Sequence, residues 1–295
     1  MKYSHSYIQQ YKQCPLSCHL RYDIRLEKED VGADEHHLKF GAAGHEAMAV
    51  LYQGGSVDEA VKAFKVGYPV QLDTEDAAKT LENGIAAIKL YADTHLKKDF
   101  ITWKVLECEV KESFDFGQEE HFTVKLDLIT EHKNQGGVYG WDHKFVGGKR
   151  ATLSYDYWGE FNPNSQITKY YAHIQKKYGD CSGFYINAVG MRFLKRAYKG
   201  EPAGFHPKFE RQLFNRTKDQ VSLEEVDTTY WIKRIEQDRV SNYFGMNTSS
   251  CKFCTYRAGI CGAGYQWPLD EELILNQYSI KERPQATQQT GVTNA

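Results

Sequence analysis

Residues 123–144 read TVKLDLIT, then EHKNQGG, then VYGWDHK, and this stretch decides the fold. In its first part, apolar and polar residues alternate around Asp127, which is typical of a half-buried strand. Gly136 and Gly137 predict a turn, and the second part predicts another strand with Asp142 near its end. We therefore expect a β-hairpin that carries one carboxylate on each strand.

The two carboxylates of this hairpin, together with Lys144, form a candidate hydrolytic site. Side chains two residues apart on a strand share a face, so Asp142 and Lys144 point one way and His143 points the other. A pair of carboxylates suits a divalent cation, and a lysine beside them adds fixed positive charge where negative charge develops. The pattern favours metal-dependent phosphodiester hydrolysis. Asp-x-Lys alone also occurs on ordinary solvated strands, so the weight comes from Asp127 on the neighbouring strand.

The composition is that of a globular protein without a strong bulk charge. The chain has 295 residues, of which 41% are hydrophobic and 14% aromatic, and its formal net charge is -2. A nucleic-acid-binding groove must therefore be local, and the candidates are residues 144–150 and 192–199. No apolar run approaches the roughly 20 residues of a membrane span, and the N-terminal stretch has no signal-peptide core. We expect a cytoplasmic protein with no membrane association.

The cysteines indicate a second metal centre. Seven cysteines in a cytoplasmic protein favour metal binding or catalysis over disulfides. Cys251, Cys254 and Cys261 are closely spaced near the C-terminus, whereas zinc and iron–sulfur clusters normally take four ligands. Cys14 is the best candidate for the fourth ligand, and Cys18 is the reserve. The alternative is that the C-terminal cysteines are free thiols in a turn.

The hydrophobic periodicity alternates between helical and strand patterns. It predicts helices within residues 4–25 and over 40–52, 57–66, 73–96, 163–178 and 224–244, with a charged loop at 26–38. Besides the hairpin, it predicts strands over 103–116, 183–189 and 208–214. This order indicates an α/β core in a single domain over 1–265, and the Gln- and Thr-rich tail over 281–295 is expected to be disordered.

Taken together, the motifs show an ordered series along the chain. They are a Cys-Pro pair at Cys14, Gly-x-x-x-His ending at His45, the strands with Asp127 and with Asp142-x-Lys144, Gln166-x-x-x-Tyr170, and the three C-terminal cysteines. This series resembles the RecB-type nucleases of the PD-(D/E)xK superfamily, in particular the iron–sulfur branch with AddB-like and CRISPR-associated adaptation exonucleases. Each motif is weak alone; the order and spacing over residues 4–261 carry the resemblance.

The resemblance implies a restriction-endonuclease-like core, with a central mixed sheet flanked by helices, a helical insertion and a C-terminal cysteine cluster. It also implies a DNA exonuclease that uses Mg²⁺ or Mn²⁺ and acts on single-stranded ends, with recombination, repair or CRISPR-adaptation proteins as partners. The metal ligands that it implies are His45, Asp127, Asp142 and the backbone carbonyl of His143. An imidazole among oxygen ligands leans such a site toward Mn²⁺.

The resemblance assigns roles to the other motif residues as well. Lys144 would position or activate the attacking water, and Gln166 and Tyr170 would orient the site and contact the DNA strand. The cysteines that would hold a 4Fe–4S cluster, with zinc as the alternative occupant, are Cys14, Cys251, Cys254 and Cys261.

The sequence departs from the family pattern or allows an alternative at several positions. The family often has Glu in place of Asp142, and its last cysteine gap varies, so the six-residue gap here does not fix the type of cluster. Glu109, on the strand before Asp127, could reach the metal or could be a plain exposed acid. The rival function is a non-catalytic DNA-binding or assembly subunit with the same fold. The intact Asp127, Asp142 and Lys144 argue against that rival.

Overall fold

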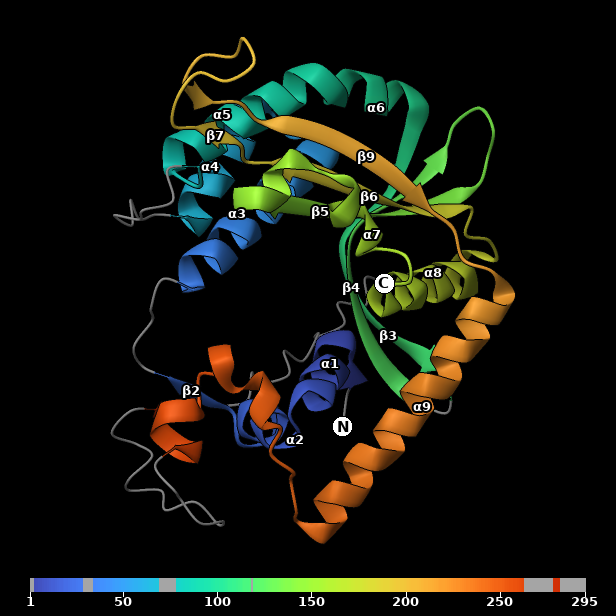
Figure 1. Ribbon diagram of the computed structural model, residues 1–295. Coiled ribbons are helices and arrows are strands. Elements are labelled where there is room, and N and C mark those ends of the chain that lie inside the picture. The colour runs from blue at the N-terminus through green and yellow to red at the C-terminus, as the bar shows by residue number, and fades with distance from the viewer. Residues whose placement is uncertain (1–2, 29–33, 69–77, 118, 263–277, 282–295) are drawn as a thin grey trace, which may run out of the picture. The chain divides into compact units, whose positions relative to one another are not determined.

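The computed structural model describes residues 3–28, 34–68, 78–117, 119–262 and 278–281 (Figure 1). Its contacts divide the chain into two compact units. The first, here called the sheet unit, comprises Met1–His5 and Gly32–Ile232, and the second, the terminal unit, comprises Ser6–Val31 and Lys233–Ala295. The single domain expected over 1–265 stays a prediction. Of the expected tail, all but Lys281 lies outside the described residues.

The sheet unit is built on a mixed sheet, which confirms the predicted α/β class. The strands follow the order β1-β4-β5-β6-β9, and β3 pairs with the other edge of β4. The β1–β4 and β5–β6 pairs are parallel and the remaining pairs are antiparallel. Figure 1 shows β5, β6 and β9 side by side. The strands are β1 (Tyr3–Ser4), β3 (Trp103–Phe116), β4 (Glu119–His132), β5 (Val138–Val146), β6 (Gly183–Gly190) and β9 (Lys208–Phe214).

Strand β4 changes its partner along one edge, and this change creates room for a site. Near its start, Phe122 and Thr123 pair with β1, and from Leu128 to Glu131 the same edge pairs with β5. Asp127 lies just before the β5 ladder begins. At Asp127, strand β4 is therefore paired with β3 on one edge, whereas its other edge lies between the residues that pair with β1 and those that pair with β5.

The helices of the sheet unit cover both faces of the sheet. They are α3 (Asp34–Tyr52), α4 (Val57–Gly67), α5 (Leu81–Tyr91), η2 (Ala92–Leu96), α6 (Lys97–Thr102), η3 (Gly148–Thr152), α7 (Tyr155–Gly159), α8 (Ser165–Tyr178) and residues 218–232 of α9 (Lys218–Ser241). The side chains of α3, α4 and α5 bury Trp141 and Phe145 of β5 in one core. Gly140, one position out of phase, lies instead against Ile174 of α8. Because side chains alternate along β5, one face of this strand packs against α3 and the other face packs against α8.

The predicted element boundaries differ most from the structure in three places. The expected loop over 26–38 contains strand β2 (Leu26–Lys28) and the start of α3. The helix expected over 73–96 begins, within the described residues, at Leu81 because Thr80 caps it by accepting from Asn83 N. Helix α9 begins six residues before the expected Glu224, because Thr217 and Gln220 exchange side-chain-to-backbone hydrogen bonds at its first turn.

The small residues of α3 allow the close approach that the sequence indicated. A side-chain carbon at Gly44 would lie 2.5 Å from the ring of Phe145. Glycine at this position therefore brings the next residue of the helix, His45, directly to the strands that carry the acids.

The terminal unit combines both ends of the chain. Its elements are α1 (His5–Gln13, from Ser6 onward), α2 (Pro15–Cys18), η1 (His19–Ile24), β2, the end of α9, η4 (Thr248–Phe253), η5 (Arg257–Cys261) and β10 (Tyr278–Ile280). Strand β10 pairs antiparallel with β2. The core is small, consisting of Leu20, Leu26, Tyr256, Ile260 and Tyr278 with a few half-buried neighbours. Among the described helices, none is both long and apolar enough to cross a membrane.

Candidate active site

Three carboxylates lie in a row across the sheet, one on each of three adjacent strands. The antiparallel registers of β4 with β3 and with β5, continued by one residue, place Glu109, Asp127 and Asp142 beside one another. We call these three residues the acid row. The sequence predicted the neighbourhood of Asp127 and Asp142 and left Glu109 open.

Asp127 is buried at the centre of this row. Its Oδ1 lies 3.0 Å from Nδ1 of His45, and its Oδ2 accepts a 2.6 Å hydrogen bond from the backbone N–H of His143. Burial opposes the ionisation of Asp127, but the hydrogen bond and charge of His45 outweigh it and hold the pKa of the carboxyl well below its usual range. In return, Asp127 raises the pKa of His45 despite the burial of the imidazole.

Asp142 and Lys144 form the second charge pair of the site. The Lys144 Nζ lies 2.6 Å from Oδ2 of Asp142. Burial raises the pKa of Asp142 to about 6. The negative charge of Asp127 also raises this pKa, whereas the positive charge of Lys144 lowers it. Burial alone would lower the pKa of Lys144, but Asp142 raises it overall, so the lysine keeps its charge. Asp142 is therefore the acid of the row most easily protonated.

Glu109 is held in an unusual backbone conformation at a position facing Asp127. Its φ is 51°, in the left-handed region that a glutamate rarely adopts. The Oε2 atom lies 2.7 Å from Nζ of Lys125, whereas Oε1 is buried without a hydrogen-bond partner among the described residues. Ligand atoms of His45, Glu109 and Asp127 all lie within 4.8 Å of one another. An imidazole with two carboxylates fits a divalent cation, and the unsatisfied Oε1 is the atom left available for one.

The side chain of His143 points away from Asp142, as the strand alternation predicted. Its ring stacks on Tyr52 of α3 with centroids 5.5 Å apart, and Nδ1 lies 2.8 Å from Nδ2 of Asn187. Burial lowers the pKa of His143 to about 3, so the imidazole is neutral. The backbone is thus the part of His143 that takes part in the site.

A buried polar network behind His143 was not predicted. Arg211 of β9 donates to Oδ1 of Asn187 at 2.9 Å and to both carboxylate oxygens of Asp99 at 2.6 and 2.7 Å. Tyr52 and Tyr91 hydrogen-bond within the same group. These residues come from distant parts of the chain, so no local sequence motif predicts the network.

Gln166 and Tyr170 occupy neighbouring turns of α8, on the sheet face that Asp142 shares. Gln166 Nε2 donates to the hydroxyl of Tyr170 at 2.8 Å. Burial raises the pKa of Tyr170, and the charges of Asp142 and Asp127 raise it further, which places the phenol within the electrostatic reach of the acids. Tyr170 is therefore near the acids, and Gln166 is linked to them through its hydrogen bond to Tyr170.

In the terminal unit, the four predicted cysteines lie in one neighbourhood. Burial raises the pKa of Cys261, and the thiols of Cys254, Cys14 and Cys251 raise it further, as close thiols do. The sulfur of Cys14 lies 3.5 Å from the backbone N of Asn247, whose carbonyl accepts from Cys251 at 3.7 Å. Cys18, the reserve ligand, donates instead to the carbonyl of Tyr7.

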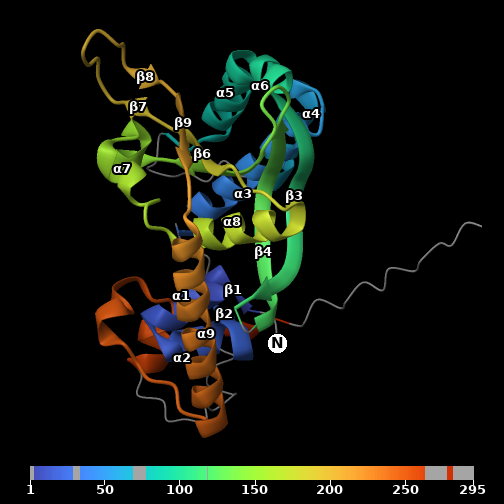
Figure 2. The same cartoon turned by 90° about the vertical axis from the view of Figure 1, so that its right-hand side faces the viewer.

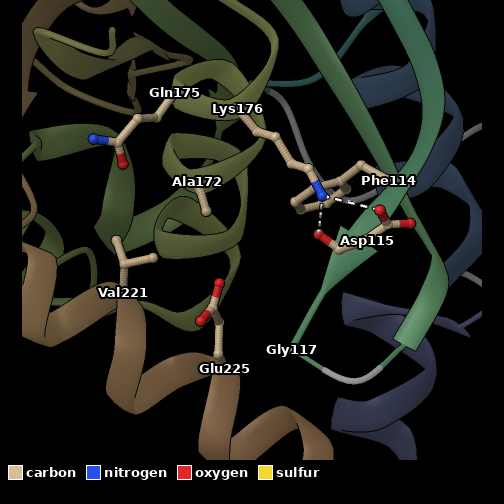
Figure 3. Close-up of a pocket in the computed structure, with 8 residues that line it drawn as sticks. All are labelled: Phe114, Asp115, Gly117, Ala172, Gln175, Lys176, Val221 and Glu225. Carbon is tan, nitrogen blue, oxygen red and sulfur yellow. Dashed lines mark hydrogen bonds and ion pairs between the residues drawn. The ribbon is translucent and has the colours of Figure 1, made fainter. Parts of the chain in front are cut away.

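A pocket of about 310 Å³ lies elsewhere in the sheet unit, between the end of β3, α8 and the first turns of α9. Figure 3 shows its lining, which includes the pair between Lys176 and Asp115 at 3.0 Å, and Glu225 across from it. None of the predicted site residues lines this pocket. The acid row and the pocket are therefore separate features.

Comparison with solved structures finds the same fold in a distant protein. A crystal structure of a protein from Eubacterium rectale, provisionally named an exonuclease, matches with a TM-score of 0.54 at 14% identity over 90% of each chain. The structure of SSO0001 covers 90% of this chain and 87% of its own at 12% identity, but its TM-score of 0.36 carries no argument. No curated protein matches the sequence.

The sequence model of the PD-(D/E)XK nuclease superfamily matches residues 2–262, which is most of the chain. The matched region contains the whole acid row, His45, Lys144 and the four cysteines. With the mixed sheet and flanking helices, this match makes the chain a member of the PD-(D/E)XK nuclease superfamily.

Proposed function

We propose that this protein is a divalent-metal-dependent DNA nuclease that removes nucleotides from single-stranded ends. The observation that carries the proposal is the acid row, with Lys144 paired to Asp142 at its edge. Membership of the superfamily supports phosphodiester hydrolysis. The exonuclease mode and the single-stranded preference rest on the sequence resemblance.

The residues that would hold the metal are His45, Glu109 and Asp127, with Asp142 and the backbone carbonyl of His143 as neighbouring ligands. The first three already present their ligand atoms within 4.8 Å of one another, and oxygen donors with one imidazole suit Mn²⁺ or Mg²⁺. When bound, such a cation lowers the pKa of a coordinated water and withdraws charge from the scissile phosphate.

Lys144 supplies the fixed charge of the proposed site. Its pKa is raised by Asp142, so it remains an ammonium beside the carboxylate at neutral pH. From there it would orient the attacking water and offset the negative charge that develops on the phosphate. Gln166 and Tyr170 would fix the neighbouring DNA strand through their amide and hydroxyl groups.

The four cysteines would hold a 4Fe–4S cluster with a structural role. What supports this part of the proposal is that the four thiols lie close enough for the other three to act on the pKa of Cys261. Zinc is the alternative occupant of the same four ligands. Freshly purified protein would be brown with the cluster and colourless with zinc.

The test is degradation of end-labelled single- and double-stranded DNA with Mn²⁺, with Mg²⁺ and with chelator, alongside Lys144→Ala. We expect metal-dependent loss of label from single strands that disappears in the variant. The labelled end that is lost first gives the polarity. DNA binding without any cleavage would overturn the proposal in favour of a non-catalytic subunit. A role in recombination, repair or CRISPR-type processing belongs to the proposal through the resemblance.

A further inference from the structure

A β-hairpin projects from the sheet unit directly after β6. Strands β7 (Phe193–Leu194) and β8 (Gly204–Phe205) pair antiparallel, and Figure 2 shows this hairpin extending beyond the neighbouring strands. At the tip, Tyr198 and Glu201 exchange backbone hydrogen bonds of 2.9 and 3.0 Å. Between them, Lys199 and Gly200 have φ values of 49° and 84°, which is the backbone of a type I′ turn. The tip of the hairpin is therefore a regular, hydrogen-bonded turn.

The hairpin is anchored at its base and exposed at its tip. Met191 is fully buried in the core of the sheet unit, and Phe205 packs against that core. By contrast, Tyr198 is 54% exposed and Phe193 38% exposed, although both are aromatic. The hairpin thus presents two aromatic side chains to solvent beside its cations.

The charge of this hairpin is strongly one-sided in a protein of net charge -2. Its sole acid, Glu201, forms an ion pair with Arg192, whose Nη1 lies 2.9 Å from Oε1 of the glutamate. Lys195, Arg196 and Lys199 are exposed, and no carboxylate of the described residues pairs with them. In the other basic stretch of this region, residues 144–150, Lys144 is paired with Asp142 and Arg150 with Glu160, which leaves exposed Lys149 without a described carboxylate partner. The hairpin therefore carries more uncompensated positive charge than that stretch does.

The hairpin leaves the sheet at the end where Lys144 lies. Strands β5 and β6 run parallel with Lys144 facing Ala188, and the backbone N of Met191 donates to the carbonyl of Val146 at 2.7 Å. Arg192 follows at once. The hairpin therefore begins at the end of the sheet at which β5, with Lys144, also ends.

We infer that the β7–β8 hairpin, residues 192–206, is a binding surface for the phosphate backbone and bases of single-stranded DNA. The inference rests on the proposed function. The three cations that no described carboxylate pairs match a phosphodiester chain, and the exposed rings of Phe193 and Tyr198 match unpaired bases, which can stack on them. Lys199 Nζ lies 5.4 Å from the centroid of the Tyr198 ring, so a phosphate and its base would meet a cation and a ring side by side. Duplex DNA, whose bases are already stacked, would use the cations but not the rings.

The experiment uses the full-length protein with Lys144→Ala, so that bound DNA is not cut, and a fluorescein-labelled oligo-dT in an anisotropy titration at several salt concentrations. Into this parent we introduce Lys195→Ala, Arg196→Ala and Lys199→Ala together, and separately Tyr198→Ala. The triple variant should weaken binding about tenfold to a hundredfold and reduce the salt slope by about 2, at roughly 0.7 per lost phosphate contact. Tyr198→Ala should weaken binding about tenfold with an unchanged slope.

The matched control removes three exposed lysines from helices α4 and α5: Lys62→Ala, Lys65→Ala and Lys89→Ala. Circular dichroism melts check each fold, and a triple glutamine variant at the hairpin replaces the alanine set if the latter melts early. Equal affinity and slope in the hairpin and control variants would overturn the hairpin inference and leave the proposed nuclease intact. A parent that binds no DNA, with a wild-type protein that cleaves none, would overturn both.

Discussion

The acid row of the sheet unit and the cysteine cluster of the terminal unit are both candidate metal centres, but the protein supports them differently. Every carboxylate of the acid row has a basic partner from the protein itself: His45 with Asp127, Lys125 with Glu109, and Lys144 with Asp142. These pairs offset the repulsion between the acids. The row is therefore assembled by side-chain contacts and by a large core behind it.

The cysteine cluster lacks that support. The contacts of Cys14 and Cys251 are weak hydrogen bonds to the backbone of Asn247, and the core of the terminal unit is small. A small core that joins two chain ends usually requires a covalent or metal link. We therefore expect the acid row to survive without its metal, whereas the terminal unit should depend on what its thiols bind.

The largest expected effect is on catalysis in the sheet unit. Lys144→Ala and Asp142→Ala should each lower the rate of DNA cleavage by about a thousandfold or more, because they remove charge from the reacting site. The melting temperature should change little, since the neighbouring pairs remain. Lys104→Ala, which removes an exposed strand lysine paired to Glu131, is the control and should cleave normally. Full activity in Lys144→Ala would contradict the assignment of the site.

The next effect is on the stability of the terminal unit. Cys254→Ala removes a ligand of the proposed cluster and should cost about 3 kcal/mol, which lowers the melting temperature by roughly 6–12 °C and bleaches the protein. Cys108→Ala, in a strand of the sheet unit, should keep the colour. An unchanged melting temperature and spectrum in Cys254→Ala would show that no metal centre bound to the thiols stabilises the terminal unit.

A smaller effect is expected at Glu109. Glu109→Gln keeps the shape of the side chain but removes its charge, and should weaken Mn²⁺ binding about tenfold in calorimetry without DNA. Glu112→Gln on the same strand, where the acid pairs with Lys177 at 2.7 Å, is the matched control. Equal affinities in the two variants would place Glu109 outside the metal site.

The pH dependence of metal binding should give the smallest effect. The raised pKa of His45 means that protonated His45 stabilises the metal-free fold below its ordinary pKa, near 6.5, and that this contribution is lost as pH rises through the raised value. A metal ion must displace that proton, and it also needs Asp142, with its pKa of about 6, to be ionised. The increase in melting temperature caused by Mn²⁺ should therefore grow from about pH 6 to about pH 8. His45→Gln should flatten this trend, and an unaltered trend would exclude His45 as a ligand.

Local sequence was enough to predict much of the fold and part of the geometry of the candidate site. The hairpin of residues 123–144 and strand β3 follow from alternation with period two, and the same rule predicted that Asp142 and Lys144 share a face while His143 points away. Superfamily membership followed from the order of motifs along the chain.

Other features required the folded chain. The left-handed backbone of Glu109, which faces the acid toward Asp127, is not encoded by any pattern in the surrounding strand. The link between Arg211, Asn187 and Asp99 joins residues from three separate elements. Periodicity and caps act over a few residues and are readable in sequence, whereas partners across a sheet are fixed only when register and packing are set together.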